Sequence, residues 1–235
     1  MSVTLIFLAG LAVIVGWWLS HQRLMSKPWL EEGAIADMPH TEASQVPAAK
    51  LGLGIFLAVV GALFAMLISA YLMRRDLSTD WRAVPMPPVL WVNTGLIVLS
   101  SVALHWAHLA VRHGDMKELR QALLTGGVSA LGFLVGQVLA WRQLSGAGYW
   151  LATNPANTFF YLLTALHGLH VAGGLAALGS TTLKAWRTAD TGRVRLSVDL
   201  CAIYWHFLLV VWLVLLALLM RWVDDFIEMC RPLLS

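Results

Sequence analysis

Six stretches of the chain contain no Asp, Glu, Lys or Arg and are long enough to cross a lipid bilayer. They comprise residues 3–19, 51–73, 89–111, 121–141, 156–183 and 200–220. A spanning helix needs about 20 mainly apolar residues, whereas the strands of a membrane β-barrel are short and alternate in polarity. The pattern therefore predicts an all-α membrane protein with six transmembrane helices.

Polar segments between these stretches predict the organisation of the chain. We expect an N-terminal transmembrane helix over residues 1–20, a cytoplasmic loop over 21–50, a five-helix transmembrane bundle over 51–222 and a short outer tail over 223–235. The 21–50 loop holds Pro28, Pro39 and Pro47 and separates the first helix from the other five. The first helix is expected to be retained, because its first basic residue, Arg23, follows the apolar run instead of preceding it.

The composition supports a lipid environment. The chain of 235 residues is 59% hydrophobic and 12% charged, with a mean hydropathy of +0.72, while soluble domains carry roughly 25% charged residues. Twelve Trp residues fit the bilayer interface, where the indole ring is buried and its N–H is hydrated. Cys201 and Cys230 flank the last apolar stretch, so they are expected to be free thiols on opposite sides of the membrane.

Basic residues predict the orientation. If the N-terminus lies outside, the inner loops hold ten Lys and Arg residues and the outer side holds six. Inner loops are usually the more basic ones, so both termini are expected on the outer side. A sequence pI of about 9.1 suits contact with anionic lipid, and nothing in it suggests nucleic acid.

Ionisable side chains within the six stretches are restricted to histidine. Proteins that move ions usually bury acidic or basic groups at membrane depth, so transport by this chain alone is not expected. His105 and His108 lie in the third stretch, His167 and His170 in the fifth, and His206 in the sixth. Each i,i+3 pair shares one helix face.

Two interpretations of these histidines are possible. They could ligate a haem b or a metal between facing helices, or they could join helices by hydrogen bonds. The second is favoured, because His167, His170, Gly174 and Thr181 form one small and polar stripe and no Cys or carboxylate accompanies them. Asn93, Ser101 and His108 form a similar stripe.

Two late segments resemble a known family. Residues 159–175 read FFYLLTALHGLHVAGGL and residues 204–213 read YWHFLLVVWL. Both are similar to signature segments of subunit III of cytochrome c oxidase, a haem-copper terminal oxidase. Residues 93–108 and Gln137 look like other segments of that family, and the resemblance covers about residues 50–222. Trp17-Trp18 resembles the second helix of the seven-helix members.

Three acidic positions of the family are apolar in this chain. A Ser-Glu pair of the family falls on Val59-Val60, a later Glu falls on Ala140, and an Asp falls on Leu209. The chain therefore has no carboxylate at these three positions. What the resemblance implies about carboxylates that assist proton uptake does not carry over to it.

The resemblance implies an accessory subunit of an aerobic, aa3-type cytochrome c oxidase that is not itself catalytic. It implies packing on catalytic subunit I, contact with other oxidase subunits, and bound phospholipid; haem and copper are expected in the partner subunits and none in this chain. The implied location is the bacterial plasma membrane, with both termini on the periplasmic side. No catalytic or metal-binding residue is expected. The structural and lipid-facing candidates are His108, His167, His170, Tyr204, Trp205 and His206.

Two other functions remain open at this point. The loss of the three acids would suit an accessory chain of a nitric oxide reductase-type complex, which need not pump protons. The histidines would instead suit a free-standing haem b membrane protein.

Overall fold

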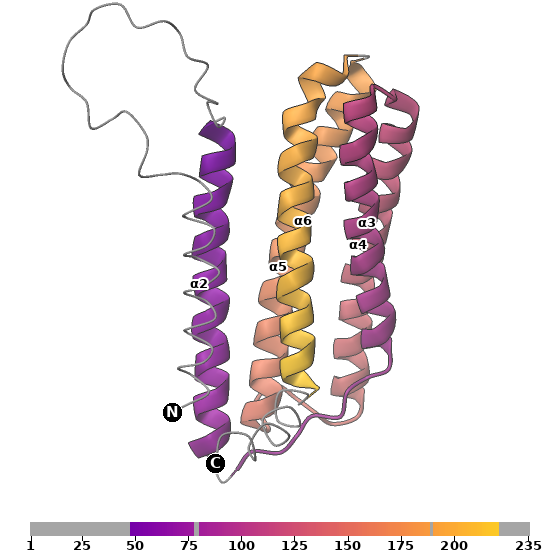
Figure 1. The fold of residues 1–235 in the computed structure, drawn as a ribbon. Coiled ribbons are helices and arrows are strands. Elements are labelled where there is room, and N and C mark those ends of the chain that lie inside the picture. Colours follow the sequence, from indigo (N-terminus) through magenta and orange to yellow (C-terminus); the bar gives the residue numbers. More distant parts are fainter. Residues whose placement is uncertain (1–47, 78–79, 189, 221–235) are drawn as a thin grey trace, which may run out of the picture. The chain divides into compact units, whose positions relative to one another are not determined.

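The computed structural model describes residues 48–77, 80–188 and 190–220. Five α-helices account for most of these residues, and each is long and apolar enough to cross a membrane. They are α2 (Ala48–Leu77), α3 (Val89–His113), α4 (Met116–Gly146), α5 (Pro155–Arg187) and α6 (Thr191–Leu219) (Figure 1). The all-α membrane class and five of the predicted helices are thus confirmed. The predicted first helix, most of the 21–50 loop, the 223–235 tail and Cys230 lie outside the described residues.

Every described helix is longer than the uncharged stretch that predicted it, and capping groups set several of the ends. Asp115 and Asp190 precede α4 and α6, and each carboxylate accepts a hydrogen bond from the backbone N–H two residues later. Asn154 caps α5 in the same way, and Pro155 follows at the first helical position. Such caps satisfy backbone donors that have no partner within the helix. Gly114 ends α3 in the left-handed conformation, with φ of 79°.

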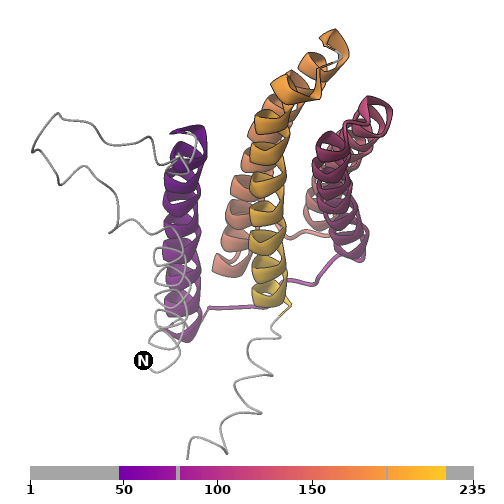
Figure 2. The ribbon, with the colours of Figure 1, turned by 45° about the horizontal axis from the view of Figure 1, so that its top comes forward.

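Four of the helices form a ring. Around this ring α3 packs against α4, α4 against α5, α5 against α6, and α6 against α3. Helix α2 lies outside the ring, where it contacts α5 and α6 (Figures 1 and 2). The N-termini of α2, α4 and α6 share one end of the bundle with the C-termini of α3 and α5. We call this end the Lys50 end and the opposite end the Trp81 end.

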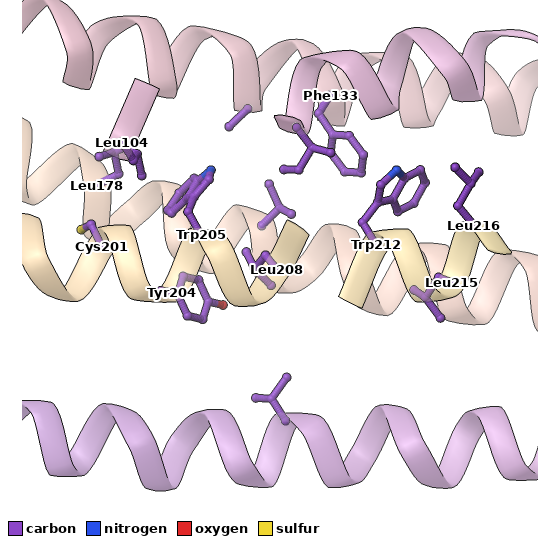
Figure 3. Close-up of a cluster of buried hydrophobic side chains, with 14 of the residues drawn as sticks. Leu104, Phe133, Leu178, Cys201, Tyr204, Trp205, Leu208, Trp212, Leu215 and Leu216 are labelled. Carbon is purple, nitrogen blue, oxygen red and sulfur yellow. The ribbon is translucent and has the colours of Figure 1, made fainter. Parts of the chain in front are cut away.

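Large apolar side chains fill the centre of the ring. Phe133 of α4 and Trp205, Leu208 and Trp212 of α6 are completely or almost completely buried there (Figure 3). Helix α2 adds one buried stripe, Val60, Phe64, Ile68 and Tyr71, and exposes most of its other side chains. Lipid accepts exposed apolar side chains at no cost, so burial within the protein follows shape and polarity more than hydrophobicity.

Candidate functional site

Three hydrogen bonds connect α3 to its neighbours across the interior. They join the Asn93 amide to Gln137 (3.3 Å), the Trp212 indole N–H to the Thr94 hydroxyl (3.0 Å), and the Ser100 hydroxyl to the Gly126 carbonyl oxygen (2.7 Å). Gly136 lies against Asn93 so closely that a Cβ there would overlap the amide oxygen. The small residues of α4 therefore allow α3 to approach closely enough for the two bonds that join α3 to α4.

A charged cluster lies at the Lys50 end between three helices. Nδ1 of His108 on α3 is 2.8 Å from a carboxylate oxygen of Asp199 on α6, and Nζ of Lys50 on α2 is 3.4 Å from the other oxygen. Asp199 is only 7% exposed. The His108 and Asp199 atoms are at ion-pair distance without the alignment of a hydrogen bond. This carboxylate therefore links α2, α3 and α6.

Asp199 was missed by the sequence prediction. The sixth uncharged stretch begins at Leu200, one residue later, whereas α6 begins at Thr191. Helix α6 therefore extends beyond that stretch and includes Asp199, which the stretch left out.

His105 and His206 form a second contact between α3 and α6. Their ring centroids are 5.7 Å apart, and the His105 ring is 6.2 Å from the His108 ring. Both His105 and His206 are exposed. Nδ1 of His206 lies 2.6 Å from the Ala202 carbonyl oxygen of its own helix, so Nε2 is the ring nitrogen left for a partner outside this helix.

His167 is completely buried among aromatic rings. Its ring centroid lies 5.2 Å from Trp212, 5.6 Å from Phe133 and 6.4 Å from Phe64. Neither ring nitrogen has a hydrogen-bond partner among the described residues. Val60 is buried one helical turn before Phe64 on the same stripe of α2. His167 is thus an unpaired polar group in an apolar cage.

Replacing His167 with Leu is expected to leave the protein equally stable or to stabilise it. An unsatisfied buried polar group costs about 1–3 kcal/mol, and Leu removes this cost with a similar volume. Reversible unfolding in mixed detergent micelles measures the change. Leu163→Ala on the same helix is the control, because it empties a fully buried site and should cost about 2–5 kcal/mol. A loss above about 1 kcal/mol for His167→Leu would reveal a polar partner, such as a buried water.

His170 and Tyr204 connect α5 to α6. The Tyr204 hydroxyl donates a hydrogen bond of 2.9 Å to the His170 carbonyl oxygen, while Nδ1 of His170 lies 2.7 Å from the Leu166 carbonyl oxygen in its own helix. Both side chains line a cavity of about 350 Å³ between α2, α5 and α6. The other lining residues are almost all apolar: Leu53, Phe56, Leu169, Gly173, Gly174, Ala177, Leu200, Cys201 and Trp205.

Trp205 fills the contact between α5 and α6. It is completely buried, and its indole N–H has no partner among the described residues. A Cβ added at Gly174 would lie 2.9 Å from the Trp205 ring and 2.6 Å from the Tyr204 ring. Only glycine at this position lets the two helices approach with both aromatic rings between them.

Five of the six predicted candidates contact another side chain or backbone group at or on α6. His108 contacts Asp199, His206 contacts His105, His170 contacts Tyr204, and Trp205 packs beside Tyr204. The sixth, His167, has no polar partner among the described residues. Within these residues no group of three or more His, Cys, Asp or Glu side chains could hold a metal ion. The residues that sequence reasoning missed are Asp199 with its partner Lys50, and the Trp212–Thr94 pair. The sequence carried no signal for the last pair, because the two residues are 118 positions apart.

The helices and polar contacts define a class of protein: a multi-pass α-helical membrane protein whose polar side chains mainly join one helix to another. The sequence matches the family described as "Cytochrome c oxidase subunit III" over residues 17–224. The chain therefore belongs to the cytochrome c oxidase subunit III family.

Relatives with this name occur in distant organisms. The chain is 33% identical to "Cytochrome c oxidase subunit 3" of Thermostichus vulcanus, over 72% of this chain and 85% of that protein. It is 31% identical to the protein of the same name from Synechocystis, over 71% and 72% of the two chains. The Rattus norvegicus protein is 27% identical over 77% and 74%.

Proposed function

We propose that this chain is a non-catalytic accessory subunit III of an aerobic, aa3-type cytochrome c oxidase, and that it packs on catalytic subunit I. The observation that carries the proposal is the family match across residues 17–224. The contacts of the described polar side chains are consistent with it, because most are made between or within helices. Haem and copper would be held by the partner subunits.

Bound phospholipid belongs to the same proposal. The apolar cavity between α2, α5 and α6 has the dimensions and lining that suit an acyl chain. Lys184 lies two helical turns beyond Ala177 of the cavity wall, towards the Lys50 end. A basic side chain at that level suits an anionic headgroup.

We further propose that the Lys50 end faces the cytoplasm of a bacterial cell and that both termini are periplasmic. Basic residues support this orientation, because cytoplasmic loops are enriched in Lys and Arg. Besides Lys50, the described part of this end holds Arg112, Lys117, Arg120, Lys184, Arg187, Arg193 and Arg195, against Arg74, Arg75, Arg82 and Arg142 at the Trp81 end.

Purification of the full chain from native membranes in mild detergent tests the function. We expect the chain to co-purify with haem- and copper-containing subunits that show an aa3-type absorbance spectrum and consume O₂. The separately expressed chain is expected to show no Soret band. A Soret band that disappears in the His170→Ala variant would overturn the proposal and favour a haem b protein.

The apolar residues at the acidic positions of the family favour a second candidate partner. Val60 and Ala140 are buried, at 3% and 0% exposure, so neither position provides a carboxylate in the interior. An accessory chain of a nitric oxide reductase-type complex would have no need of one for pumping. NO turnover by the co-purified complex, without an aa3-type spectrum, would support this candidate over the oxidase.

A further inference from the structure

The outer edge between α3 and α6 is one of the edges of the described ring that α2 does not cover. Helix α2 covers the edge between α5 and α6, and no described helix packs over the edge between α3 and α6. In Figure 1 these two helices run next to each other along the bundle. Their outward side chains are therefore available to lipid or to another chain.

This edge carries polar groups away from the ends of two helices that are long and apolar enough to cross a membrane. His206 lies near the middle of α6 and His105 about two turns from the end of α3. Both rings are exposed and lie 5.7 Å apart. The residues around them, Val102, Leu109, Ile203 and Val210, are exposed and apolar. We call these six residues the α3–α6 face.

Two imidazoles on an apolar face do not suit contact with lipid tails. Ionisable residues within membrane spans almost always face protein or water, because hydrocarbon offers no hydrogen bonds. Nε2 of the exposed His206 ring has no partner among the described residues, and the exposed His105 ring makes no hydrogen bond to any of them. Behind them, His108 is already engaged with Asp199. The ring nitrogens of His105 and His206 that lack a partner are thus on exposed side chains, where a group outside the described residues can reach them.

We propose that the α3–α6 face binds a transmembrane helix of another subunit, one that places a hydrogen-bonding side chain, foremost a carboxylate, at the depth of His105 and His206. The apolar residues around the histidines pack against this helix, and the two rings recognise its polar group. This inference rests on the proposed function, since it assigns a docking surface to a chain that works in a complex.

Photo-crosslinking in native membranes tests the surface. Val210 or Val102 is replaced with benzoylphenylalanine in the full chain, and illumination is followed by mass spectrometry. We expect crosslinks to another subunit of the complex. Val128 and Val135 on the outward side of α4 are matched controls, because they are equally exposed and apolar, and we expect no such product from them.

A histidine variant tests the recognition. His105→Leu combined with His206→Leu is expected to lower the amount of that subunit recovered with the chain about tenfold, the change that the loss of one strong hydrogen bond gives. His113→Leu is the control, because it is an exposed histidine of the same helix outside the face. Since leucine suits a lipid-facing position, the isolated double variant should keep its size-exclusion profile.

The outcomes separate the inference from the proposed function. Crosslinks only to lipid, or only to the chain's own residues 1–47, would overturn the inference and leave the subunit function standing. Equal recovery of the partner by the double variant and by His113→Leu would do the same. If the unaltered chain co-purified with no other subunit, the proposed function would fail and the docking surface with it.

Discussion

Gly174→Ala should destabilise the protein by about 1–3 kcal/mol, the usual effect of adding atoms to a tightly packed interior. The new methyl group would lie 2.6 Å from the Tyr204 ring and 2.9 Å from the Trp205 ring. Trp205 is completely buried, so relieving this overlap requires either a shift of the packed rings or a separation of α5 from α6. Separation would also weaken the hydrogen bond from the Tyr204 hydroxyl to the His170 carbonyl oxygen. Reversible unfolding in mixed micelles measures the loss.

Gly173→Ala is the matched control for this prediction. Gly173 precedes Gly174 in the same helix, and a Cβ there would meet nothing within 4 Å. Alanine also favours a helix over glycine by about 1 kcal/mol, so this variant should be neutral or slightly more stable. If Gly173→Ala and Gly174→Ala lowered the free energy of unfolding equally, the effect would not come from the α5–α6 contact. The two helices would then be packed less tightly at Gly174 than the structure shows.

Asp199→Asn should destabilise the protein by about 1.5–3 kcal/mol, which is the range for hydrogen bonds to charged groups such as the one that Lys50 donates to Asp199. The substitution keeps the size of the side chain but removes the negative charge shared by His108 and Lys50. Breaking a fully buried pair costs more. Here the side chains of His108 and Lys50 are 21% and 35% exposed, so water offsets part of the loss.

A double-mutant cycle with His108→Gln tests this coupling. If the two side chains interact directly, the cycle gives an interaction energy of about 0.5–3 kcal/mol. Arg193→Gln supplies a control cycle with Asp190→Asn, an exposed pair of the same helix end that should show at most about 1 kcal/mol. If the effects of the Asp199 and His108 substitutions were additive, the two side chains would have no measurable interaction energy despite their short distance.

The number, type and order of the described helices could be read from the sequence, because each uncharged stretch marks one helix. Their ends could not, since the capping side chains of Asp115, Asn154 and Asp190 extend the helices into charged sequence. This is why Asp199 was assigned to a loop although it lies inside α6. A search for uncharged stretches leaves out any carboxylate, including one such as Asp199 that is paired with side chains of other helices.

The candidate residues were found in part. Periodicity placed His105 with His108 and His167 with His170 on common helix faces. Both pairs do lie within one helix, α3 and α5 respectively. Periodicity could not separate His167, enclosed by Phe133 and Trp212, from His206, which is exposed. Both lie at similar depth in equally apolar sequence. Their difference arises from which helix packs on which face.

The sequence by itself determined that the chain crosses a membrane, where its helices lie, and the family to which it belongs, since hydropathy and short motifs are local properties of the chain. The tertiary structure alone decided which polar groups meet: Asp199 with Lys50 and His108, and Trp212 with Thr94. In lipid the apolar surface is nearly uniform, so the helix arrangement depends on small residues and sparse polar contacts. Such contacts join residues far apart in the chain and leave no periodic signal.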